Sequence, residues 1–335
     1  MSGGVTSAAA PLLEVVGLSK HYPLRRASFF GRRPAVEMRA VDDVSFRLEA
    51  GQTLGLVGES GCGKTTTARS LLNLVRPTAG AVRFEGEDIV PLFQAGKRED
   101  VLRLRRRVQY VFQDPYLSLN PRWTIGDTLR EPLRIHRPDA PKLWQARIEE
   151  LLGMVGLERH HAWRYPHEFS GGQRQRVGIA RALAVEPRLL LLDEPVSSLD
   201  ISVRAQILNL LVEIQDRLGL AYLYISHDLS SVRFISTHVA VMYLGRIVEI
   251  GEVDALFAHP RHHYTRALLS AIPVPDPDAV DTRIPLQGEV PSAAARARGC
   301  AFHPRCPAAT AICREVVPVL AGTDARQQVA CHNPA

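Results

Sequence analysis

The spacing of hydrophobic residues changes several times along the chain, and each spacing predicts a different element. Leu12–Val16 and Val41–Leu48 predict strands, the second because apolar and polar residues alternate with a period of two. Between them, Tyr22–Arg39 is basic and marked by Gly and Pro, which predicts a long surface loop. Residues 12–57 therefore predict antiparallel strands joined by turns.

Short apolar runs farther along predict buried strands. They are Thr53–Val57, Ala81–Phe84, Val108–Phe112, Leu189–Leu192 and Leu220–Ile225. The run of leucines suits a strand of a parallel sheet that is covered on both faces. Segments with helical spacing lie between these runs, at Thr65–Leu74, Arg174–Val185 and Val203–Leu218. Strands that alternate with helices in this way predict an α/β fold with a parallel sheet.

Residues 116–180 interrupt this alternation with a long helical stretch. Its periodicity is clearest in Trp144–Val155, and prolines at 115, 121, 132, 138, 141 and 166 punctuate it. We expect a helical insertion between two strands of the core. After the last buried strand, Val239–Ile250 alternates around Gly245-Arg246, which predicts a β-hairpin.

A glycine-rich stretch between the strand Thr53–Val57 and the next helix carries the first chemistry. Its residues are Gly58, Glu59, Ser60, Gly61, Cys62, Gly63, Lys64, Thr65 and Thr66, and they match the phosphate-binding pattern G-x-x-x-x-G-K-S/T. The glycines let backbone N–H groups curl around a polyphosphate, and the helix N-terminus adds partial positive charge. Lys64 is predicted to reach the β- and γ-phosphates, and the Thr65 hydroxyl to hold Mg²⁺. The flanking strand and helix make this a predicted nucleotide site.

Polar residues also stand at the ends of the predicted buried strands. Gln113 follows Val108–Phe112, and Asp193-Glu194 follows the leucine strand. Two carboxylates at a buried strand end are costly unless a metal or a reacting group meets them. Asp193 is predicted to contact Mg²⁺, and Glu194 to act as the base that activates the attacking water. His227 ends the next strand and is a candidate for contacting the γ-phosphate.

A second glycine-rich turn, Phe169–Gln173, opens the helix Arg174–Val185. By the physics of the first loop, the Ser170 hydroxyl and the N–H groups of Gly171 and Gly172 suit phosphate oxygens. The sequence therefore predicts two turns that can bind phosphate.

Composition narrows the class of protein. The chain has 335 residues, and its length favours one large domain plus a smaller one. No apolar run approaches the roughly 18–20 residues of a membrane span, and the N-terminus lacks a secretory signal, so we expect a cytosolic protein. The formal net charge of +6 suits an anionic ligand or membrane surface. The densest basic run, Arg103–Arg107, predicts a solvated helix end, so no nucleic-acid partner is expected.

In their order, these motifs resemble the nucleotide-binding subunit of an ATP-binding cassette (ABC) transporter, across roughly residues 12–255. The matching pieces are the phosphate loop, Gln113 as the Q-loop glutamine, Phe169–Gln173 as the signature, Asp193-Glu194 as the Walker B pair, Ser198-Leu199-Asp200 as the D-loop and His227 as the switch histidine. Tyr22 aligns with the aromatic residue that stacks on adenine. Phe169 stands where Leu is commoner. The resemblance implies a RecA-like parallel-sheet core with an antiparallel β-subdomain and a helical subdomain at about 116–180.

Three further segments resemble the dipeptide/oligopeptide importer branch, which nickel importers share. These segments are Phe112–Pro121, Ile201–Gln206 and Pro260–Leu269. The His21-Tyr22-Pro23 start and the segment Gly299–Phe302 resemble the second of the two ATPase subunits in such importers. The resemblance implies that residues 256–335 form a C-terminal extension, with a linker at 273–299 and a small cysteine-rich cap.

The resemblance also implies partners and residue roles. Two ATPase subunits face head to tail and bury two ATP molecules, so the signature residues Ser170, Gly171, Gly172 and Gln173 act on the partner's nucleotide. The expected catalytic residues are Lys64, Gln113, Glu194 and His227, and the expected Mg²⁺ contacts are Thr65, Gln113 and Asp193. Two membrane permeases and, indirectly, an extracytoplasmic binding protein complete the importer. The chain is then expected at the cytoplasmic face of the inner membrane.

Four of the five cysteines lie near the C-terminus, at Cys300, Cys306, Cys313 and Cys331, with the spacing C-x5-C-x6-C-x17-C. Disulfides are disfavoured in a cytosolic ATPase, and structural zinc usually shows closer C-x2–4-C pairs. Thiolates without such pairs suit a 4Fe–4S cluster, and the importer ATPases resemble this tail. Zinc completed by His303 or His332, and thiols without metal, stay open as alternatives.

Two other functions stay open at this point. An ABC ATPase can work on DNA, ribosomes or cluster assembly, but DNA-repair members carry very long coiled-coil insertions and translation members usually carry two cassettes. A nucleotide-sensing regulator without turnover needs neither Glu194 nor His227. ATP hydrolysis that powers di- or oligopeptide import is the favoured function, with nickel or another solute as the alternative cargo.

Overall fold

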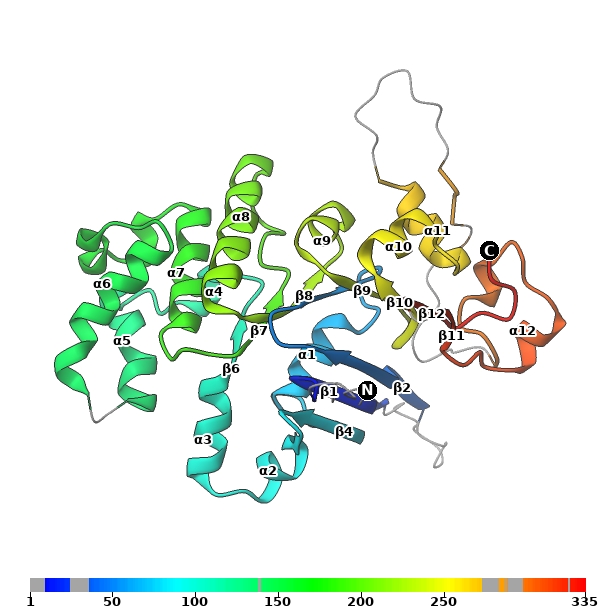
Figure 1. Ribbon diagram of the computed structural model, residues 1–335, viewed down its shortest axis with the longest axis horizontal. Coiled ribbons are helices and arrows are strands. Elements are labelled where there is room, and N and C mark those ends of the chain that lie inside the picture. Colours follow the sequence, from blue (N-terminus) through cyan, green and yellow to red (C-terminus); the bar gives the residue numbers. More distant parts are fainter. Residues whose placement is uncertain are drawn as a thin grey trace, which may run out of the picture.

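The computed structural model describes residues 10–24, 36–137, 140–272, 283–286, 288, 298–324 and 326–335. Two sheets lie at its centre, with helices around them (Figure 1). No helix in this described part of the chain is long and apolar enough to span a bilayer.

The larger sheet has eight strands in the order β11-β12-β10-β9-β3-β8-β7-β6. Its strands are β3 (Thr53–Val57), β6 (Val108–Val111), β7 (Leu189–Asp193), β8 (Ala221–Ser226), β9 (His238–Tyr243), β10 (Arg246–Glu252), β11 (Ala321–Asp324) and β12 (Gln327–Val329). Strands β6, β7, β8, β3 and β9 run parallel, whereas β10, β12 and β11 continue the sheet in antiparallel pairs. The predicted parallel core and the β9–β10 hairpin are confirmed.

Successive residues of the parallel strands pack on opposite faces of the sheet. In β7, Leu190 and Leu192 join one hydrophobic cluster and Leu189 and Leu191 join the other. All four leucines are at most 1% exposed. Burial of each such side chain contributes about 1.5–3 kcal/mol, so a strand covered on both faces anchors the residues that follow it.

The smaller sheet has the order β2-β1-β4-β5. Its strands are β1 (Leu13–Leu24), β2 (Val36–Leu48), β4 (Ala79–Phe84) and β5 (Glu87–Asp88). The predicted surface loop Tyr22–Arg39 is wrong at both ends, because β1 continues to Leu24 and β2 starts at Val36, with Tyr22 opposite Met38. An antiparallel ribbon with a solvated face accommodates basic residues, so their charge does not prevent strand pairing. Residues 25–35 lie outside the described part.

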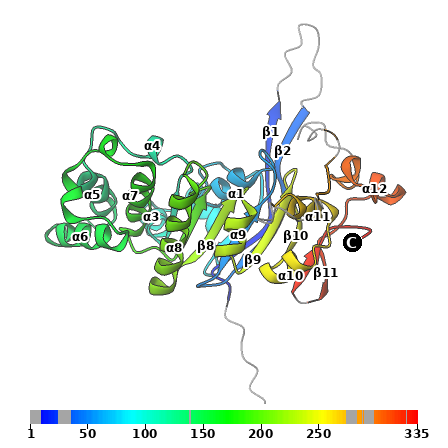
Figure 2. The same cartoon turned by 90° about the horizontal axis from the view of Figure 1, so that it is seen from above.

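Helices fill the chain between β6 and β7. They are α4 (Pro115–Ser118), α5 (Ile125–His136), α6 (Trp144–Met154) and α7 (Gly171–Leu183), with 3-10 turns at Pro141–Leu143, Arg159–Trp163 and Pro166–Glu168. Pro141 and Pro166 each start a turn, where a missing N–H costs nothing. Helices α5, α6 and α7 lie at one end of the molecule and α12 at the other (Figure 1 and Figure 2).

The remaining helices surround the two sheets. They are α1 (Lys64–Leu71), α2 (Ile89–Ala95), α3 (Arg98–Arg107), α8 (Ile201–Leu218), α9 (Leu229–Ile235), α10 (Val253–Ala258), α11 (His263–Ser270) and α12 (Ala311–Glu315), with the 3-10 turn η4 (His303–Arg305). The basic run Arg103–Arg107 ends α3 with Leu104 buried, which confirms the predicted helix end.

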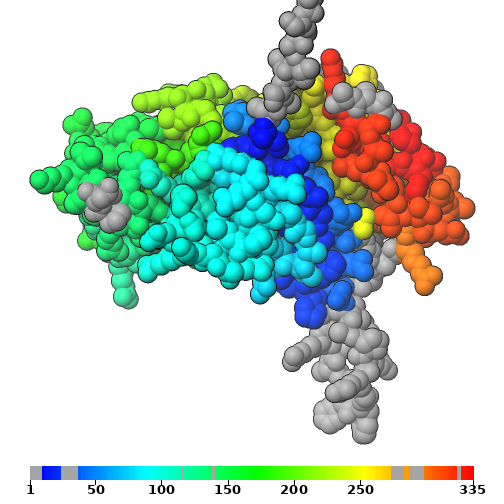
Figure 3. Space-filling view, turned by 60° about the horizontal axis from the view of Figure 1, so that its bottom comes forward, coloured from blue at the N-terminus to red at the C-terminus, as the bar shows by residue number. Residues whose placement is uncertain are grey.

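The C-terminal extension (residues 256–335) packs against the core. Its strand β12 pairs with β10, and its Phe302 belongs to the same hydrophobic cluster as Tyr243. In the space-filling view the extension, orange to red, adjoins the blue N-terminal strands (Figure 3). Helix α10 spans the predicted boundary at residues 255 and 256, and the boundary stays a prediction. The predicted linker 273–299 falls mostly outside the described residues.

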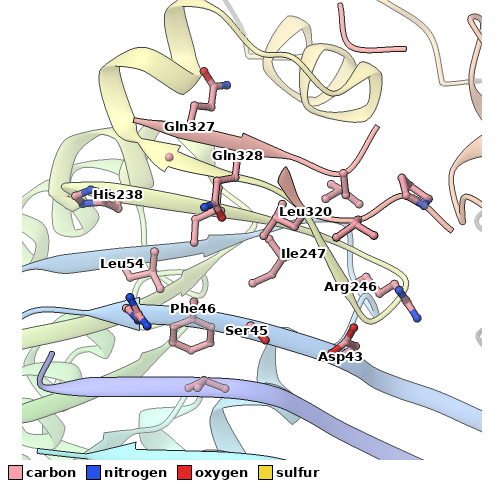
Figure 4. Close-up of a pocket in the computed structure, with 18 of the residues that line it drawn as sticks. Asp43, Ser45, Phe46, Leu54, His238, Arg246, Ile247, Leu320, Gln327 and Gln328 are labelled. Atoms are coloured by element: carbon pink, nitrogen blue, oxygen red, sulfur yellow. The ribbon is translucent and has the colours of Figure 1, made fainter. Parts of the chain in front are cut away.

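A cavity of about 920 Å³ lies between the extension and the N-terminal strands. Phe46 and Leu54 line it from the core, Ile247 from β10, and Leu320 and Gln328 from the extension (Figure 4). None of the residues predicted to bind ATP is among its lining residues.

Candidate functional site

Three parallel strands bring the predicted site residues to one edge of the larger sheet. β3 pairs with β8, and β8 pairs with β7, all in parallel register. The phosphate loop (Gly58–Thr66) follows β3, Asp193 ends β7, and His227 follows β8. The edge predicted from the strand ends is therefore present.

Lys64 is held by the phosphate loop itself. Its ammonium donates to the carbonyl oxygens of Gly58 at 2.8 Å and Glu59 at 3.1 Å, and approaches Cys62 Sγ at 3.8 Å. Lys64 is only 5% exposed, and a buried cation without partners costs several kcal/mol. Phosphate oxygens carry full charge where carbonyls carry partial charge, so the ammonium gains by exchanging these carbonyls for a polyphosphate.

The shape of the phosphate loop requires glycine at two positions. Gly58 and Gly63 have φ of 153° and 109°, and an added Cβ would lie 2.2 Å from the carbonyl oxygens of Met242 and Ala40, respectively. Gly63 also leaves the start of α1 without a side-chain cap. The first N–H groups of that helix therefore lack side-chain acceptors, an arrangement that suits an anion.

The other loop residues differ in exposure. Ser60 and Gly61 are exposed at the tip, whereas Thr66 is half-buried in α1. Burial raises the pKa of the Cys62 thiol, which therefore stays protonated against Lys64. Tyr22, the predicted adenine contact, lies on β1 with the Lys20 ammonium 4.8 Å above its ring.

Asp193 is buried, with both carboxylate oxygens hydrogen-bonded. Thr65 Oγ1 donates to Oδ1 at 2.9 Å, and the Tyr110 hydroxyl donates to Oδ2 at 2.6 Å. Thr65 and Asp193, two predicted Mg²⁺ contacts, are thus in direct contact. Two hard oxygen ligands side by side at the phosphate loop fit Mg²⁺, which is bound through few protein ligands together with phosphates.

Sequence reasoning missed Tyr110. It lies on β6 opposite Leu191, two residues before Asp193 on the neighbouring strand. Burial first, and then the charge of Asp193, raise the pKa of Tyr110 far above its usual range, so the hydroxyl stays a donor. A tyrosine inside the apolar run Val108–Phe112 was the available signal, since a buried hydroxyl needs a partner.

Two of the other predicted catalytic residues contact Glu194. Gln113 Nε2 donates to Glu194 Oε2 at 3.2 Å, and His227 Nδ1 lies 3.2 Å from the same oxygen. The Glu194 backbone has a φ of 48°, which is rare for a residue other than glycine. Its N–H donates to the Ile225 carbonyl at 2.9 Å, which fixes this turn beside β8. Backbone strain of this kind concentrates at functional sites.

The signature turn is well formed by its own hydrogen bonds. The Ser170 hydroxyl accepts the Gln173 N–H at 3.3 Å, and Gln173 Oε1 accepts the Ser170 N–H at 3.0 Å. Gly172 packs on Val203, where a Cβ would lie 2.3 Å from Cγ1. Across the described ranges, no hydrogen bond or ion pair joins this turn to the phosphate loop, Asp193 or Glu194. Asp200, the predicted D-loop residue, is exposed at the start of α8.

The four cysteines of the extension are free thiols. The Cys300 N–H donates to the Cys313 carbonyl at 2.9 Å. Burial, with smaller contributions from the other three thiols, raises the pKa of Cys331 to about 11. Within the described part of the chain, no three His, Cys, Asp or Glu side chains gather as a metal ion requires. The predicted iron–sulfur cluster thus has no support from this geometry.

The two histidines of the zinc alternative have other partners. His303 Nδ1 lies 2.8 Å from the Cys300 carbonyl oxygen, and His332 Nε2 lies 2.9 Å from that of Val316. Each ring has one nitrogen against a backbone carbonyl, an arrangement that is compatible with a metal at the other nitrogen. These two contacts therefore do not decide the zinc alternative, which gains no support from the grouping of side chains in the described residues.

Two families match the sequence. The family described as ABC transporter matches residues 41–197, which contain the phosphate loop and Glu194. The family described as the C-terminal region of oligopeptide/dipeptide transporters matches residues 248–313, from β10 to Cys313.

Curated relatives are similar to this chain over nearly its whole length. The probable peptide ABC transporter ATP-binding protein y4tS of Sinorhizobium fredii is 53% identical over 96% of this chain and 89% of its own. The oligopeptide transport ATP-binding protein AppF of Bacillus subtilis is 47% identical over 96% and 97%, respectively. The di/tripeptide transport ATP-binding protein DppF of Pseudomonas aeruginosa is 47% identical over 94% and 95%.

Solved structures share the core of the fold. The dimeric post-hydrolysis structure of the ATP-binding cassette MJ0796, bound to ADP and Pi, has a TM-score of 0.62 at 26% identity and covers 72% of this chain and 98% of that one. The structure of cbiO1 from Clostridium perfringens, part of an ABC transporter complex, has a TM-score of 0.62 at 27% identity and covers 74% and 91%.

Proposed function

The chain belongs to the ATP-binding proteins of oligopeptide/dipeptide ABC transporters, and on this premise we propose that it hydrolyses ATP to power peptide import. The observation that carries the proposal is the contact of Gln113 and His227 with the Glu194 carboxylate, beside the pair of Thr65 and Asp193. AppF and DppF are named for oligopeptide and di/tripeptide transport, which favours peptides as cargo over nickel or another solute.

In the proposed site, ATP lies along the phosphate loop. The binding residues are Gly58, Glu59, Ser60, Gly61, Cys62, Gly63, Lys64, Thr65 and Thr66, with Tyr22 stacked on the adenine. Lys64 exchanges the carbonyls of Gly58 and Glu59 for β- and γ-phosphate oxygens. Thr65 and Asp193, with Gln113, would hold Mg²⁺, which offsets phosphate charge when bound.

Glu194 is the proposed general base. Its carboxylate accepts the proton of the attacking water, and Gln113 fixes the orientation of that carboxylate by donating to Oε2. His227 lies against the same oxygen with 58% of its side chain exposed, so the ring is placed to meet a γ-phosphate that enters from solvent. Lys64, Gln113, Glu194 and His227 thus form the proposed catalytic group.

We place the signature turn in trans. Ser170, Gly171, Gly172 and Gln173 are proposed to close the nucleotide site of a second ATPase subunit, with Asp200 at the same interface. Support comes from the lack of any hydrogen bond or ion pair, among the described residues, between this turn and the chain's own phosphate loop. It also comes from the chain's similarity to the ATP-binding cassette MJ0796, whose solved structure is dimeric. Two membrane permeases then hold the pair at the cytoplasmic face of the inner membrane, downstream of an extracytoplasmic binding protein.

The test is Glu194→Gln in the assembled transporter. We expect ATP turnover to fall by about 10²–10⁴-fold, the usual contribution of a general base, while ATP binding persists. Glu213→Gln, on the exposed face of α8, is the matched control and keeps full turnover. An unchanged turnover rate in Glu194→Gln would refute the proposed base. Uptake of peptides and of nickel by a deletion strain identifies the cargo.

For the extension, we retain a 4Fe–4S cluster at Cys300, Cys306, Cys313 and Cys331 as a proposal. Its support is the donor set alone, because four free thiols lie between residues 300 and 331. Iron and acid-labile sulfide measured after anaerobic purification test it. Stoichiometric zinc without iron would overturn it.

The domain limits also stay a proposal. We assign residues 12–255 to the ATPase domain, with its helical subdomain at about 116–180, and residues 256–335 to the cysteine-rich extension. The proposed function does not depend on the exact limits.

A further inference from the structure

The C-terminal extension reaches the phosphate loop at Glu59. Arg305 Nη1 lies 2.9 Å from Glu59 Oε2, and Nη2 lies 3.2 Å from Oε1, so the guanidinium meets the carboxylate with two parallel hydrogen bonds. The Arg305 side chain is 6% exposed and that of Glu59 is 24% exposed. A bidentate ion pair that is largely shielded from solvent is stronger and more fixed in geometry than an exposed pair.

A second residue of the extension holds the backbone of Glu59. The Glu59 N–H donates to the Tyr264 hydroxyl at 2.9 Å, and Tyr264 is fully buried. An N–H committed in this way points away from a polyphosphate, so Glu59 anchors the loop. Its backbone is held by Tyr264, which lies 205 positions away in the sequence, and its side chain is held by Arg305, which lies 246 positions away.

An aromatic cluster fixes the position of Arg305. Phe302, at the start of η4, is 2% exposed and packs its ring 5.3 Å from that of Tyr243 and 5.5 Å from that of Tyr264. The Tyr243 hydroxyl lies 3.5 Å from Arg305 Nη1. Because Phe302 and Arg305 belong to one turn, the packing of the Phe302 ring positions the Arg305 guanidinium beside Glu59.

Glu59 in turn contacts Lys64. Its carbonyl oxygen accepts from the Lys64 ammonium at 3.1 Å, so one residue joins Arg305 to the lysine of the phosphate loop. We propose that Arg305 is a positioning residue of the ATP site, which holds Glu59 and through it the phosphate loop in the shape that receives nucleotide. The extension thereby sets ATP affinity without touching ATP. This inference rests on the proposed ATP site.

The physical reason is preorganisation. A loop already ordered in its binding shape loses less conformational entropy when the ligand arrives, so the gain appears as affinity. Removing Arg305 frees the Glu59 side chain and loosens the loop before ATP binds. Once ATP is bound, the phosphates hold the loop themselves, so the chemical step is expected to change little.

The experiment measures ATP affinity by the full-length chain and KM and kcat by the assembled transporter, for Arg305→Ala, Arg305→Lys, Glu59→Gln and the double variant Arg305→Ala/Glu59→Gln. We expect Arg305→Ala to raise Kd and KM for ATP about tenfold while kcat stays within about twofold. Arg305→Lys keeps the positive charge but loses the bidentate contact with the Glu59 carboxylate, so it is expected to give an intermediate Kd. Because both residues act through one contact, the double variant is no weaker than the worse single variant.

Arg83→Ala is the matched control. Arg83 pairs with Glu14 at 2.9 Å on the smaller sheet, so this variant also breaks an arginine–glutamate pair and is expected to keep the wild-type Kd. If Arg305→Ala does not fold, Arg305→Lys and Glu59→Gln carry the test. Wild-type Kd in both would overturn the inference, and so would effects that multiply in the double variant. Failure of the wild-type chain to bind ATP at all would instead overturn the proposed ATP site.

Discussion

The two glycine-rich turns of this chain are supported in opposite ways. The phosphate loop is pressed between other elements, with Gly58 against the Met242 carbonyl and Gly63 against that of Ala40. Its lysine is buried, and its Glu59 is held by the distant extension. The signature turn at Ser170 instead satisfies its own cap through Gln173. Among the described residues it forms no hydrogen bond with the proposed catalytic residues of its chain.

The difference teaches which half of a site each turn builds. A loop that must enclose a polyphosphate and bury a cation needs support from the whole fold, because neither the strained glycines nor the buried ammonium is stable alone. A helix start that closes over a ligand from outside needs only a rigid cap and an open face. This contrast is what the proposed two-subunit site requires, with one half-site built around the phosphate loop and the signature turn serving a partner.

The sharpest way to break this comparison is Ser170→Asp. Aspartate keeps the cap of α7, because it is as good an N-cap as serine, but it sets a negative charge against an incoming phosphate. We expect turnover by the assembled transporter to fall about 10²–10³-fold, the usual cost of losing one preorganised donor in the transition state. ATP affinity of the isolated chain is expected to stay at the wild-type value.

Ser170→Asn is the control for Ser170→Asp, since it caps the helix without adding charge and is expected to lose less turnover. Equal losses of ATP affinity in the isolated chain and of turnover in the transporter would place the turn in cis, and the contrast between the two turns would fail.

The half-site within the chain was largely readable from sequence, and the reason is topological. Parallel strands end at a common edge, so Asp193, Glu194 and His227 had to meet near the phosphate loop once the strands were identified. Their supports were not readable in the same way. The contact of Tyr110 with Asp193 depends on which strand neighbours β7, and that of Arg305 with Glu59 spans 246 positions.

The error at Tyr22–Arg39 has the same origin. Local composition indicated a loop, but pairing between β1 and β2 decided the structure, and pairing is a non-local contact. The cysteine spacing likewise predicted a ligand set without fixing where the thiols lie. Local sequence signals thus predicted the elements and the motifs. The contacts that hold those motifs in place join distant segments, and local signals did not predict them.

Tyr110→Phe tests the hydrogen bond that holds Asp193 in the half-site around the phosphate loop, and its expected effect is smaller than that of Ser170→Asp. The variant removes the donor to Asp193 Oδ2 and leaves that oxygen unsatisfied in a buried place, while Thr65 still donates to Oδ1. A hydrogen bond to a charged group contributes about 1.5–3 kcal/mol, of which part orients the carboxylate for Mg²⁺. We expect the Mg²⁺ concentration that half-saturates turnover to rise about tenfold.

Tyr222→Phe is the matched control, because Tyr222 is buried in β8 of the same sheet and donates to the Leu211 carbonyl, away from the site. Its Mg²⁺ dependence is expected to equal that of the wild type. An unchanged Mg²⁺ dependence in Tyr110→Phe would remove this hydroxyl from the support of the site.

The smallest expected effect concerns acid and the anchoring of Glu59. His262 caps α11 by accepting the Tyr264 N–H at 3.1 Å, and burial, with a smaller contribution from His263, lowers its pKa to about 3. Below pH 6.5 the unfolded chain takes up a proton at His262 and the folded chain does not, so stability is lost as pH falls. The loss is about 1.4 kcal/mol per pH unit between pH 6.5 and 3.

His262→Asn isolates this loss, because asparagine keeps the cap and does not titrate. Urea unfolding at pH 7.5 and 5.5 measures it, and we expect the wild type to lose about 1.4 kcal/mol more than the variant. The buried Glu249 carboxylate accepts the His262 N–H, and burial raises its pKa, so Glu249 acts in the opposite direction; it titrates in both proteins and cancels in the difference. Equal losses would show that His262 is not the acid-sensitive group beneath the phosphate loop.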